Sequence, residues 1–209
     1  MRAAVFDLGG VLIDWNPRHL YRALFDDEAA MESFLRDVCS PAWNAELDAG
    51  RPFGPAVEAL AAEHPDLREL VVAYDRRWGE MVAGPIDDAV LLLAELRRAG
   101  VRLFALSNWS AEKYAITKPR FAFLDWFEAI VISGDLGVCK PDPRIFVHAI
   151  ETHRIEPATT LFVDDHESNV RAAAGLGFIA RRFVGAAELR RELVDLGVLA
   201  AAAPVSQDG

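Results

Sequence analysis

The 209-residue chain has few cysteines and no long uninterrupted apolar segment. Its two cysteines, Cys39 and Cys139, are too few for a disulfide framework, which favours a reducing compartment. No window approaches the roughly 18 consecutive apolar residues that a membrane span requires. No secretory leader pattern precedes the first apolar run. We therefore expect a cytoplasmic protein that has no membrane partner.

Positive charge is also scarce. The chain carries 22 lysines and arginines against 32 acidic residues, which gives a net charge of −10, and no basic run exceeds two residues. Nucleic-acid binding needs basic stripes, so we expect no nucleic-acid partner. A small anionic ligand would need local neutralisation by backbone amides, a cationic side chain or a metal. The sequence leaves open whether the protein is a monomer or a homodimer.

The chain begins with a short apolar run that ends in a carboxylate. Ala3 to Phe6 is typical of a buried strand, and Asp7 follows it directly, just before the pair Gly9-Gly10. Open parallel sheets bind ligands at the carboxyl ends of their strands. Glycine lets a ligand approach the backbone closely. We expect the chemistry of this protein to begin at Asp7.

A helix-rich segment follows. Alanine, leucine and glutamate are frequent in it, β-branched runs are nearly absent, and Pro17 favours a helix over residues 18–25. Breaks at residues 40–41, 50–52 and 64–65 predict four or five helices. The expected organisation is a helical cap at 16–83, inserted into a core of residues 1–15 and 84–199, with a frayed tail at 200–209.

From residue 84 onward, strand-like and helix-like segments alternate. This alternation predicts the α/β class, with one doubly wound parallel sheet that includes residues 3–6 and carries helices on both faces. We expect helices at 88–99, 142–153 and 168–174, the first and last followed by Gly100 and Gly175, and helical sequence at 111–123 that is broken at Lys118-Pro119. We expect strands at 101–106, 129–133, 160–163 and 180–183.

Polar residues stand where several of these apolar strands end. Carboxylates at Asp7, Asp164 and Asp165 would repel one another unless a cation lay between them, and an all-oxygen ligand set suits Mg²⁺. Lys140 can hold Asp7 ionised and bind a phosphoryl oxygen. Ser107 and Asn108 add a hydroxyl, an amide and backbone N–H groups. Such a set suits phosphoryl transfer, which depends on positioning and charge stabilisation.

Four stretches resemble the motifs of the haloacid dehalogenase (HAD) superfamily of hydrolases, in order and over essentially the whole chain. They read FDLGGV at residues 6–11, LSN at 106–108, KPDP at 140–143 and FVDD at 162–165. The resemblance implies a Rossmann-like HAD core with a helical cap inserted after the first motif. It also implies that Asp7 is a nucleophile forming an aspartyl-phosphate, that Asp7, the carbonyl of Gly9 and Asp165 hold Mg²⁺ with Asp164 as an outer or alternative ligand, and that Ser107, Asn108 and Lys140 bind the transferring group.

One position departs from the family pattern. Phosphatases of this family usually carry a second aspartate two residues after the nucleophile, as an acid and base, and here that residue is Gly9. Losing a positioned acid or base typically costs roughly 10²–10⁴-fold in rate. One hypothesis is that Gly9 restricts the enzyme to activated leaving groups such as the anomeric hydroxyl of a sugar-1-phosphate.

Three functions therefore remain open. We favour Mg²⁺-dependent hydrolysis of a small phosphorylated metabolite, with sugar phosphates as candidate substrates, because Asp164-Asp165 has little use without a cation. A metal-independent 2-haloacid dehalogenase is the alternative, since dehalogenases of this family also lack the second aspartate. A catalytically impaired binding or regulatory module is the third.

Further residues are candidates with weaker signals. Candidate substrate contacts are Trp15, Trp43, Asp48 and Trp109, with Glu46 and Arg51 beside them in the cap; each is singly more typical of a core aromatic or a solvated charge. Asp14 and His19 are candidates to replace the missing acid, although turn and capping roles suit them better. His166 is expected to be exposed at a helix start, and Asn169, one turn on, is a candidate to hydrogen-bond the metal ligands.

Overall fold

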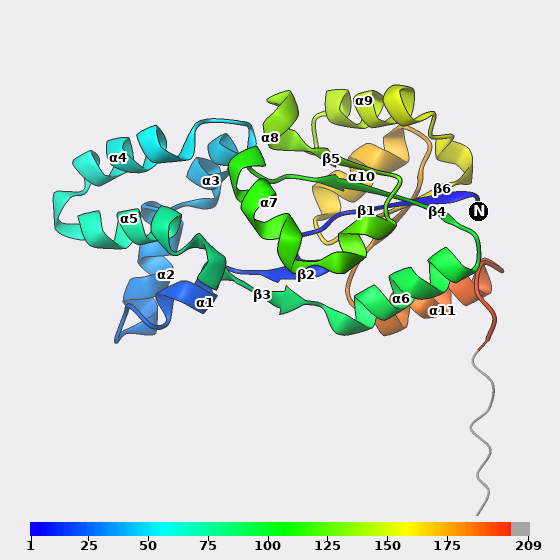
Figure 1. The fold of residues 1–209 in the computed structure, drawn as a ribbon, viewed down its shortest axis with the longest axis horizontal. Coiled ribbons are helices and arrows are strands. Elements are labelled where there is room, and N and C mark those ends of the chain that lie inside the picture. The colour runs from blue at the N-terminus through cyan, green and yellow to red at the C-terminus, as the bar shows by residue number, and fades with distance from the viewer. Residues whose placement is uncertain (202–209) are drawn as a thin grey trace, which may run out of the picture.

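The structure, a computed structural model, describes residues 1–201, so most of the tail expected at 200–209 lies outside the described part. Five parallel strands form the central sheet in the order β5-β4-β1-β6-β7, with β1 in the middle. The chain moves outward from β1 first through β4 to β5 and then, on the other side, through β6 to β7. This confirms the predicted doubly wound sheet (Figure 1). The strands are β1 Ala3–Phe6, β4 Arg102–Ser107, β5 Ala129–Ile132, β6 Thr160–Asp164 and β7 Ile179–Arg182.

Side chains of the sheet alternate between two apolar clusters, one on each face. Along β1, Ala4 and Phe6 belong to one cluster, whereas Ala3 and Val5 belong to the other. Both faces are buried because helices cover them, which is why these strands read as continuous apolar runs. Helices α6 (Asp87–Arg98) and α11 (Ala186–Asp195) pack on the first face, and α9 (Pro143–His153) and α10 (Glu167–Gly175) on the second (Figure 1).

Helix ends follow the predicted capping signals in part. The Asp142 side chain accepts a hydrogen bond from the backbone N–H of Arg144, 2.9 Å away, and caps α9. Gly100 takes the left-handed conformation after α6, with φ of +78°. The expected stop at Gly175 is wrong, because α10 includes that residue and Gly177, with φ of +90°, follows the helix instead.

Other boundaries also differ from the prediction. The segment 111–123 breaks at Lys118-Pro119 as predicted: α7, Ala111–Thr117, ends there, and the rest forms two short 3₁₀ helices at Lys118–Arg120 and Ala122–Trp126. Ser133 begins a short helix, α8 (Ser133–Leu136), and does not end β5. Neither α8 nor α11 was anticipated, since the first is a single turn and the second follows the last motif of the core.

The segment between residues 16 and 83 is helical, as expected. Of the predicted helix at 18–25 only α1, Arg18–Tyr21, forms, because the chain turns before Asp27 caps the next helix. Two strands that sequence reasoning missed, β2 (Ile13–Trp15) and β3 (Val82–Pro85), pair antiparallel where this segment leaves and rejoins the sheet. The remaining elements are α2 Glu28–Asp37, α3 Pro41–Asp48, α4 Phe53–Glu63, α5 Arg68–Arg76 and the 3₁₀ helices Pro65–Leu67 and Trp78–Met81.

Polar contacts join this helical segment to the sheet-bearing part. Lys113 of α7 is buried and forms an ion pair with Asp75 of α5, and its ammonium lies 4.4 Å from the centre of the Phe53 ring. The carboxylate of Glu112 accepts a hydrogen bond from the Phe53 N–H at 3.2 Å. These contacts fix α4 and α5 against the start of α7.

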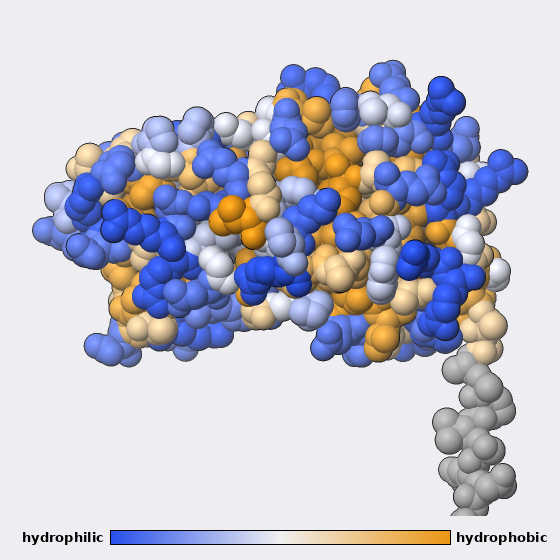
Figure 2. Space-filling model, viewed as in Figure 1, coloured by the Kyte–Doolittle hydropathy of each residue, from blue (hydrophilic) through white to orange (hydrophobic). Residues whose placement is uncertain are grey.

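The surface is mainly hydrophilic. In Figure 2 blue side chains cover most of the face shown, and the orange areas between them are small. The large exposed apolar residues occur singly, for example Leu91 on α6 and Val184 after β7. Among residues 1–201, none of the helices combines the length and the apolar character that crossing a membrane would demand.

Candidate active site

Three polar side chains meet at the carboxyl edge of the sheet. Asp7 follows β1 directly, and Ser107 and Asp164 are the last residues of the neighbouring strands β4 and β6. Because these strands are parallel and adjacent, residues separated by about a hundred positions in sequence come together here. Ser107 Oγ donates a hydrogen bond to Asp7 Oδ1 over 2.8 Å.

Lys140 occupies the centre of this group. Its ammonium is 2.7 Å from Asp164 Oδ2 and 3.0 Å from Asp7 Oδ1, and its side chain is completely buried. Burial alone would lower the pKa of Lys140, but the two carboxylates outweigh it and leave the pKa raised. The lysine therefore stays charged and neutralises one of the two buried negative charges.

The two carboxylate oxygens of Asp7 have different surroundings. Oδ1 accepts hydrogen bonds from the Leu8 N–H at 2.7 Å and from Ser107, in addition to the Lys140 contact. Oδ2 has no hydrogen-bond partner within residues 1–201. Burial raises the pKa of Asp7 above its usual value, although Lys140 opposes the shift. The unpartnered oxygen leaves Asp7 able to accept one further ligand.

The Asn108 side chain is already engaged. Its Nδ2 donates to the Lys140 carbonyl at 2.9 Å, and its Oδ1 accepts from the Lys140 N–H at 2.7 Å. The Asn108 amide therefore fixes the backbone of Lys140, and its second Nδ2 N–H has no role in this pair of bonds. This pair of bonds positions the lysine beside Asp7.

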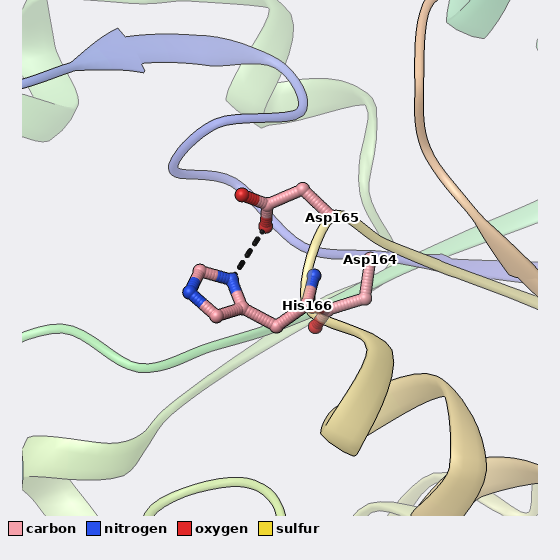
Figure 3. Close-up of side chains that lie close together, drawn as sticks. All are labelled: Asp164, Asp165 and His166. Atoms are coloured by element: carbon pink, nitrogen blue, oxygen red, sulfur yellow. Dashed lines mark hydrogen bonds and ion pairs between the residues drawn. The ribbon is translucent and has the colours of Figure 1, made fainter.

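The neighbouring carboxylates of Asp164 and Asp165 differ in burial and in hydrogen bonding. Asp164 is fully buried, and its oxygens accept from Lys140, from the His166 N–H at 2.9 Å and from Asn169 Nδ2 at 3.0 and 3.1 Å. Asp165 is partly exposed, and its Oδ1 lies 3.0 Å from Nδ1 of His166; Figure 3 shows this carboxylate and ring turned toward each other. Asp164 thus holds Lys140, while Asp165 is the more available ligand.

Electrostatics at Asp165 favour its charged form. Burial raises the pKa of Asp165, but the hydrogen bond from His166 and the charge of Lys140 outweigh this and leave the pKa lowered. The same hydrogen bond raises the pKa of His166, whose side chain is 71% exposed at the start of α10. The expected exposure of His166 is thus confirmed, and its ring also lines the cavity described below.

The glycine turn after β1 brings Asp165 close to the backbone. Gly10 has φ of +74°, and a Cβ there would lie 2.8 Å from Asp165 Oδ2. A Cβ on Gly9 would meet nothing within 4 Å. Only a residue without a side chain lets Asp165 approach this turn. Asp7, Asp165 and the carbonyls of the turn offer oxygen donors only, which is the donor chemistry that Mg²⁺ prefers.

A cavity of about 640 Å³ opens onto Asp7. The sheet-bearing part contributes the turn at Gly9 and His166, and the helical segment contributes α2 and α3. A smaller chamber of about 40 Å³ adjoins it, since both share several lining residues. The small chamber is lined by Gly9, Trp15, Asn44, Asp48, Trp78, Asn108 and Trp109.

Some candidates lie away from both cavities. Trp43 does not line them, because its ring packs edge-on against Tyr74 with centroids 5.1 Å apart. Glu46 and Arg51 pair with each other on the surface. Asp14 pairs with His19 at 2.9 Å, also outside the lining.

Sequence reasoning missed Asn44 and Trp78. Asn44 lies one helical turn before Asp48 on α3 and donates to Asp48 Oδ2 at 2.8 Å. The i, i+4 spacing of the two polar residues was a usable signal. Trp78 is 2% exposed and follows α5, and no local pattern distinguished it from a core aromatic.

Known proteins that are similar to this chain include a phosphatase and a dehalogenase. A D-ribitol-5-phosphate phosphatase from Bacteroides thetaiotaomicron is 38% identical over 213 aligned residues, which cover 90% of this chain and 95% of that protein. Among solved structures, a magnesium complex of a HAD-family enzyme from Bacteroides thetaiotaomicron is 21% identical, covers 88% of this chain and 93% of its own, and has a TM-score of 0.66. An L-2-haloacid dehalogenase from Xanthobacter autotrophicus with chloropropionic acid covalently bound is 25% identical, covers 96% and 85%, and has a TM-score of 0.63.

A family model that covers most of the chain shows the family. The model of a family described as haloacid dehalogenase-like hydrolases matches residues 1–177, which include all four motifs of the site. The relatives in this family include enzymes named as phosphatases. On the strength of this match, the site and the fold, the chain belongs to the haloacid dehalogenase-like hydrolases.

Proposed function

We propose that this hydrolase cleaves a small phosphate monoester in an Mg²⁺-dependent reaction through an aspartyl-phosphate at Asp7. The observation that carries the proposal is the arrangement of Asp7: one oxygen is held by three donors, the other is unpartnered, and the residue faces a cavity large enough for a small metabolite. A carboxylate fixed in this way can attack phosphorus without further reorganisation.

Asp7, the Gly9 carbonyl and Asp165 are the proposed ligands of Mg²⁺. When bound, the ion supplies positive charge that lowers the pKa of Asp7 and offsets the charge of the phosphoryl oxygens. Asp164 is proposed to act through Lys140, because its own oxygens are already occupied by four hydrogen bonds. The all-oxygen character of the set supports Mg²⁺ over a softer metal.

Other residues of the chain are proposed to bind the phosphoryl group, to orient Asp7 and to limit the access of water. Lys140 has a third N–H beyond its two carboxylate contacts, and we assign it to a phosphoryl oxygen. Ser107 orients Asp7 through its hydroxyl. Asn108 lines the cavity beside Asp7, and we assign its backbone N–H to the transferring group. The helical segment acts as the cap, limiting the access of water while the phosphoryl group moves to Asp7.

The proposed substrate class is a sugar or polyol phosphate. The relative named D-ribitol-5-phosphate phosphatase supports this class. Trp15, Trp78 and Trp109 line the small chamber, and the indole N–H of each is buried without a partner within residues 1–201. Indole rings and unpaired N–H donors suit the C–H faces and hydroxyl oxygens of a carbohydrate.

A 2-haloacid dehalogenase is the second candidate. The specific observation in its favour is the open space at Gly9, where no carboxylate stands to protonate a leaving group, and a halide needs no proton. The availability of Asp165 as a ligand argues for the phosphatase.

Release of inorganic phosphate tests the proposal. Wild type and Asp7→Asn are assayed on p-nitrophenyl phosphate and a panel of sugar and polyol phosphates, with Mg²⁺ and with EDTA, beside chloride release from 2-chloropropionate. We expect phosphate release that needs Mg²⁺ and disappears in Asp7→Asn. Chloride release that persists in EDTA, with no phosphate release, would establish the dehalogenase instead.

The metal ligands are tested separately. Asp165→Asn should abolish the rise in Tm that Mg²⁺ causes, because a ligand that binds only the folded state stabilises it by mass action. Asp142→Asn, a carboxylate at the N-terminus of α9 that faces no cavity, is the matched control. An unchanged Mg²⁺ response in Asp165→Asn would remove Asp165 from the ligand set.

A further inference from the structure

The phosphatase proposed above has an unassigned step. An alkoxide leaving group needs a proton, and the position where this family usually carries the acid is Gly9. A Cβ at Gly9 would meet nothing within 4 Å, so no neighbouring side chain fills the space that the acid would occupy. The site therefore needs a proton donor from elsewhere in the chain.

Asp48 is placed to supply it. It is the last residue of α3 and lines both the large cavity, with Asp7 and Gly9, and the small chamber on the other side of Gly9. In the small chamber Asp48 is the only lining side chain with an acid or base group, among residues 1–201. The other candidates for this task, Asp14 and His19, line neither space.

The Asp48 carboxyl is held in a fixed orientation by both parts of the protein. Oδ1 accepts from the Ser110 N–H at 3.1 Å, Oδ2 accepts from Asn44 Nδ2 at 2.8 Å, and the backbone carbonyl accepts from Ser133 Oγ at 2.6 Å. Each oxygen retains one free lone-pair position, which can carry a proton. The Ser110 and Ser133 contacts hold this cap residue to the strand ends β4 and β5.

The surroundings of Asp48 keep it able to exchange a proton near neutral pH. Burial, together with the charge of Asp7 and against the hydrogen bonds from Ser110 and Asn44, raises the pKa of Asp48 to about 7. Tyr74 of α5 and Cys139 are titratable groups near Asp48. Both have raised pKa values and therefore remain neutral. No lysine or arginine contacts Asp48 in the part of the chain described, so nothing forces it to remain ionised.

We propose that Asp48, on the cap, is the general acid and base that replaces the residue missing at Gly9. This inference rests on the proposed function. In the first step an Asp7 oxygen bonds to phosphorus, the bond from phosphorus to the ester oxygen breaks, and that oxygen takes the Asp48 proton and leaves as the alcohol. In the second step water attacks the same phosphorus and gives a proton to the Asp48 carboxylate. The bond from phosphorus to Asp7 then breaks, which releases phosphate and restores both aspartates.

Two substrates separate proton transfer from a merely structural role. Loss of a proton donor slows esters of ordinary alcohols, whereas p-nitrophenolate is stable enough to leave unprotonated. In Asp48→Asn we expect the single-turnover rate of alcohol release from the best polyol phosphate to fall about 10²–10⁴-fold, with less than about threefold change in the rate of the p-nitrophenol burst. Steady-state rates should fall for both substrates, because hydrolysis of the shared aspartyl-phosphate also uses Asp48. Asparagine keeps one acceptor oxygen, so part of the cap contact survives. Asp66→Asn, an exposed carboxylate in the same helical segment, is the matched control.

A rescue variant tests the assignment independently. The open space at Gly9 can accept a side chain. Gly9→Asp placed in the Asp48→Asn background should therefore raise the rate on the polyol phosphate at least tenfold above that of Asp48→Asn alone. Asp14→Asn should leave unchanged the ratio of the rates on the polyol phosphate and on p-nitrophenyl phosphate, because Asp14 lines neither cavity.

Each remaining outcome is decisive. Equal losses of the single-turnover rate on both substrates would make Asp48 a positioning residue and overturn the proposal, as would a change in the ratio of the two single-turnover rates in Asp14→Asn. A wild type that cleaves aryl phosphates but no alkyl phosphate would also overturn it and would support the restriction to activated leaving groups expected from Gly9. Failure of the proposed function is distinct, since the wild type would then release no phosphate from any ester.

Discussion

Replacing Lys140 by methionine should destabilise the protein strongly, because this lysine compensates two buried carboxylates. Its ammonium lies 2.7 Å from Asp164 and 3.0 Å from Asp7, and none of its side chain is exposed. Methionine fills a similar volume without charge. Breaking a buried ion pair by removing one partner costs about 3–5 kcal/mol. For a chain of this size that corresponds to a fall in Tm of roughly 6–20 °C.

The destabilisation by Lys140→Met should depend on pH. Burial already raises the pKa of Asp7, and without the opposing charge of Lys140 its folded-state pKa should rise further above the value of about 3.9 for an unfolded aspartate. A carboxyl group whose pKa is raised by folding destabilises the folded state most at a pH where the group must be ionised. The loss in free energy of unfolding should therefore be largest at pH 7 and should shrink as the pH falls toward 5. Urea unfolding in EDTA at both pH values measures it, with EDTA removing any contribution from bound cations.

Two controls accompany this measurement. Lys118→Met, at an exposed lysine after α7, should change the free energy of unfolding by no more than about 0.5 kcal/mol. The double variant Lys140→Met with Asp164→Asn should recover about 0.5–3 kcal/mol relative to additivity, because one of the uncompensated charges is gone. A loss below about 1 kcal/mol in Lys140→Met, equal at pH 7 and pH 5, would refute the reasoning.

Two glycine substitutions have matched controls within the chain. Gly10→Ala should cost about 1–2 kcal/mol from its φ of +74°, and should weaken the Mg²⁺-induced Tm shift by displacing Asp165. Gly9→Ala, measured in the same calorimetric titration, should do neither, and equal effects would contradict the prediction. Gly134→Ala should destabilise by about 1–3 kcal/mol because its Cβ would lie 2.5 Å from the Ala111 nitrogen. Gly175→Ala, in open space on α10, should stabilise by about 0.5–1 kcal/mol in urea unfolding, and a loss there would be unexpected.

The sequence alone determined the sheet and the polar edge of the site. Residues 3–6 and the other core strands are continuous apolar runs because both faces of the sheet are covered, so their existence is visible without the structure. The rule that parallel strands share a carboxyl edge was enough to bring Asp7, Ser107 and Asp164 together. These inferences depend on local patterns and on one topological rule.

Boundaries and short elements were less predictable. The strands β2 and β3 have three and four residues, too few for a period to emerge, and they form only because the chain returns to the same place 67 residues later. The single-turn helix α8 is likewise fixed by contacts with other segments, since its Gly134 packs against the backbone at Trp109 and Ala111. Local propensity does not encode such partners.

Only the tertiary structure decided the roles within the site. Asp164 and Asp165 are identical and adjacent in sequence, but alternation along β6 turns one toward Lys140 and leaves the other beside the turn at Gly10. Similarly, Trp43 and Trp109 are equally plausible candidates by sequence, yet one packs into the core and the other lines the chamber. Asp48 gains its neighbours from α7 and α8, 62 and 85 residues away. A sequence specifies which groups are available, whereas their solvation and hydrogen-bond partners, which set their chemistry, arise from contacts between distant segments.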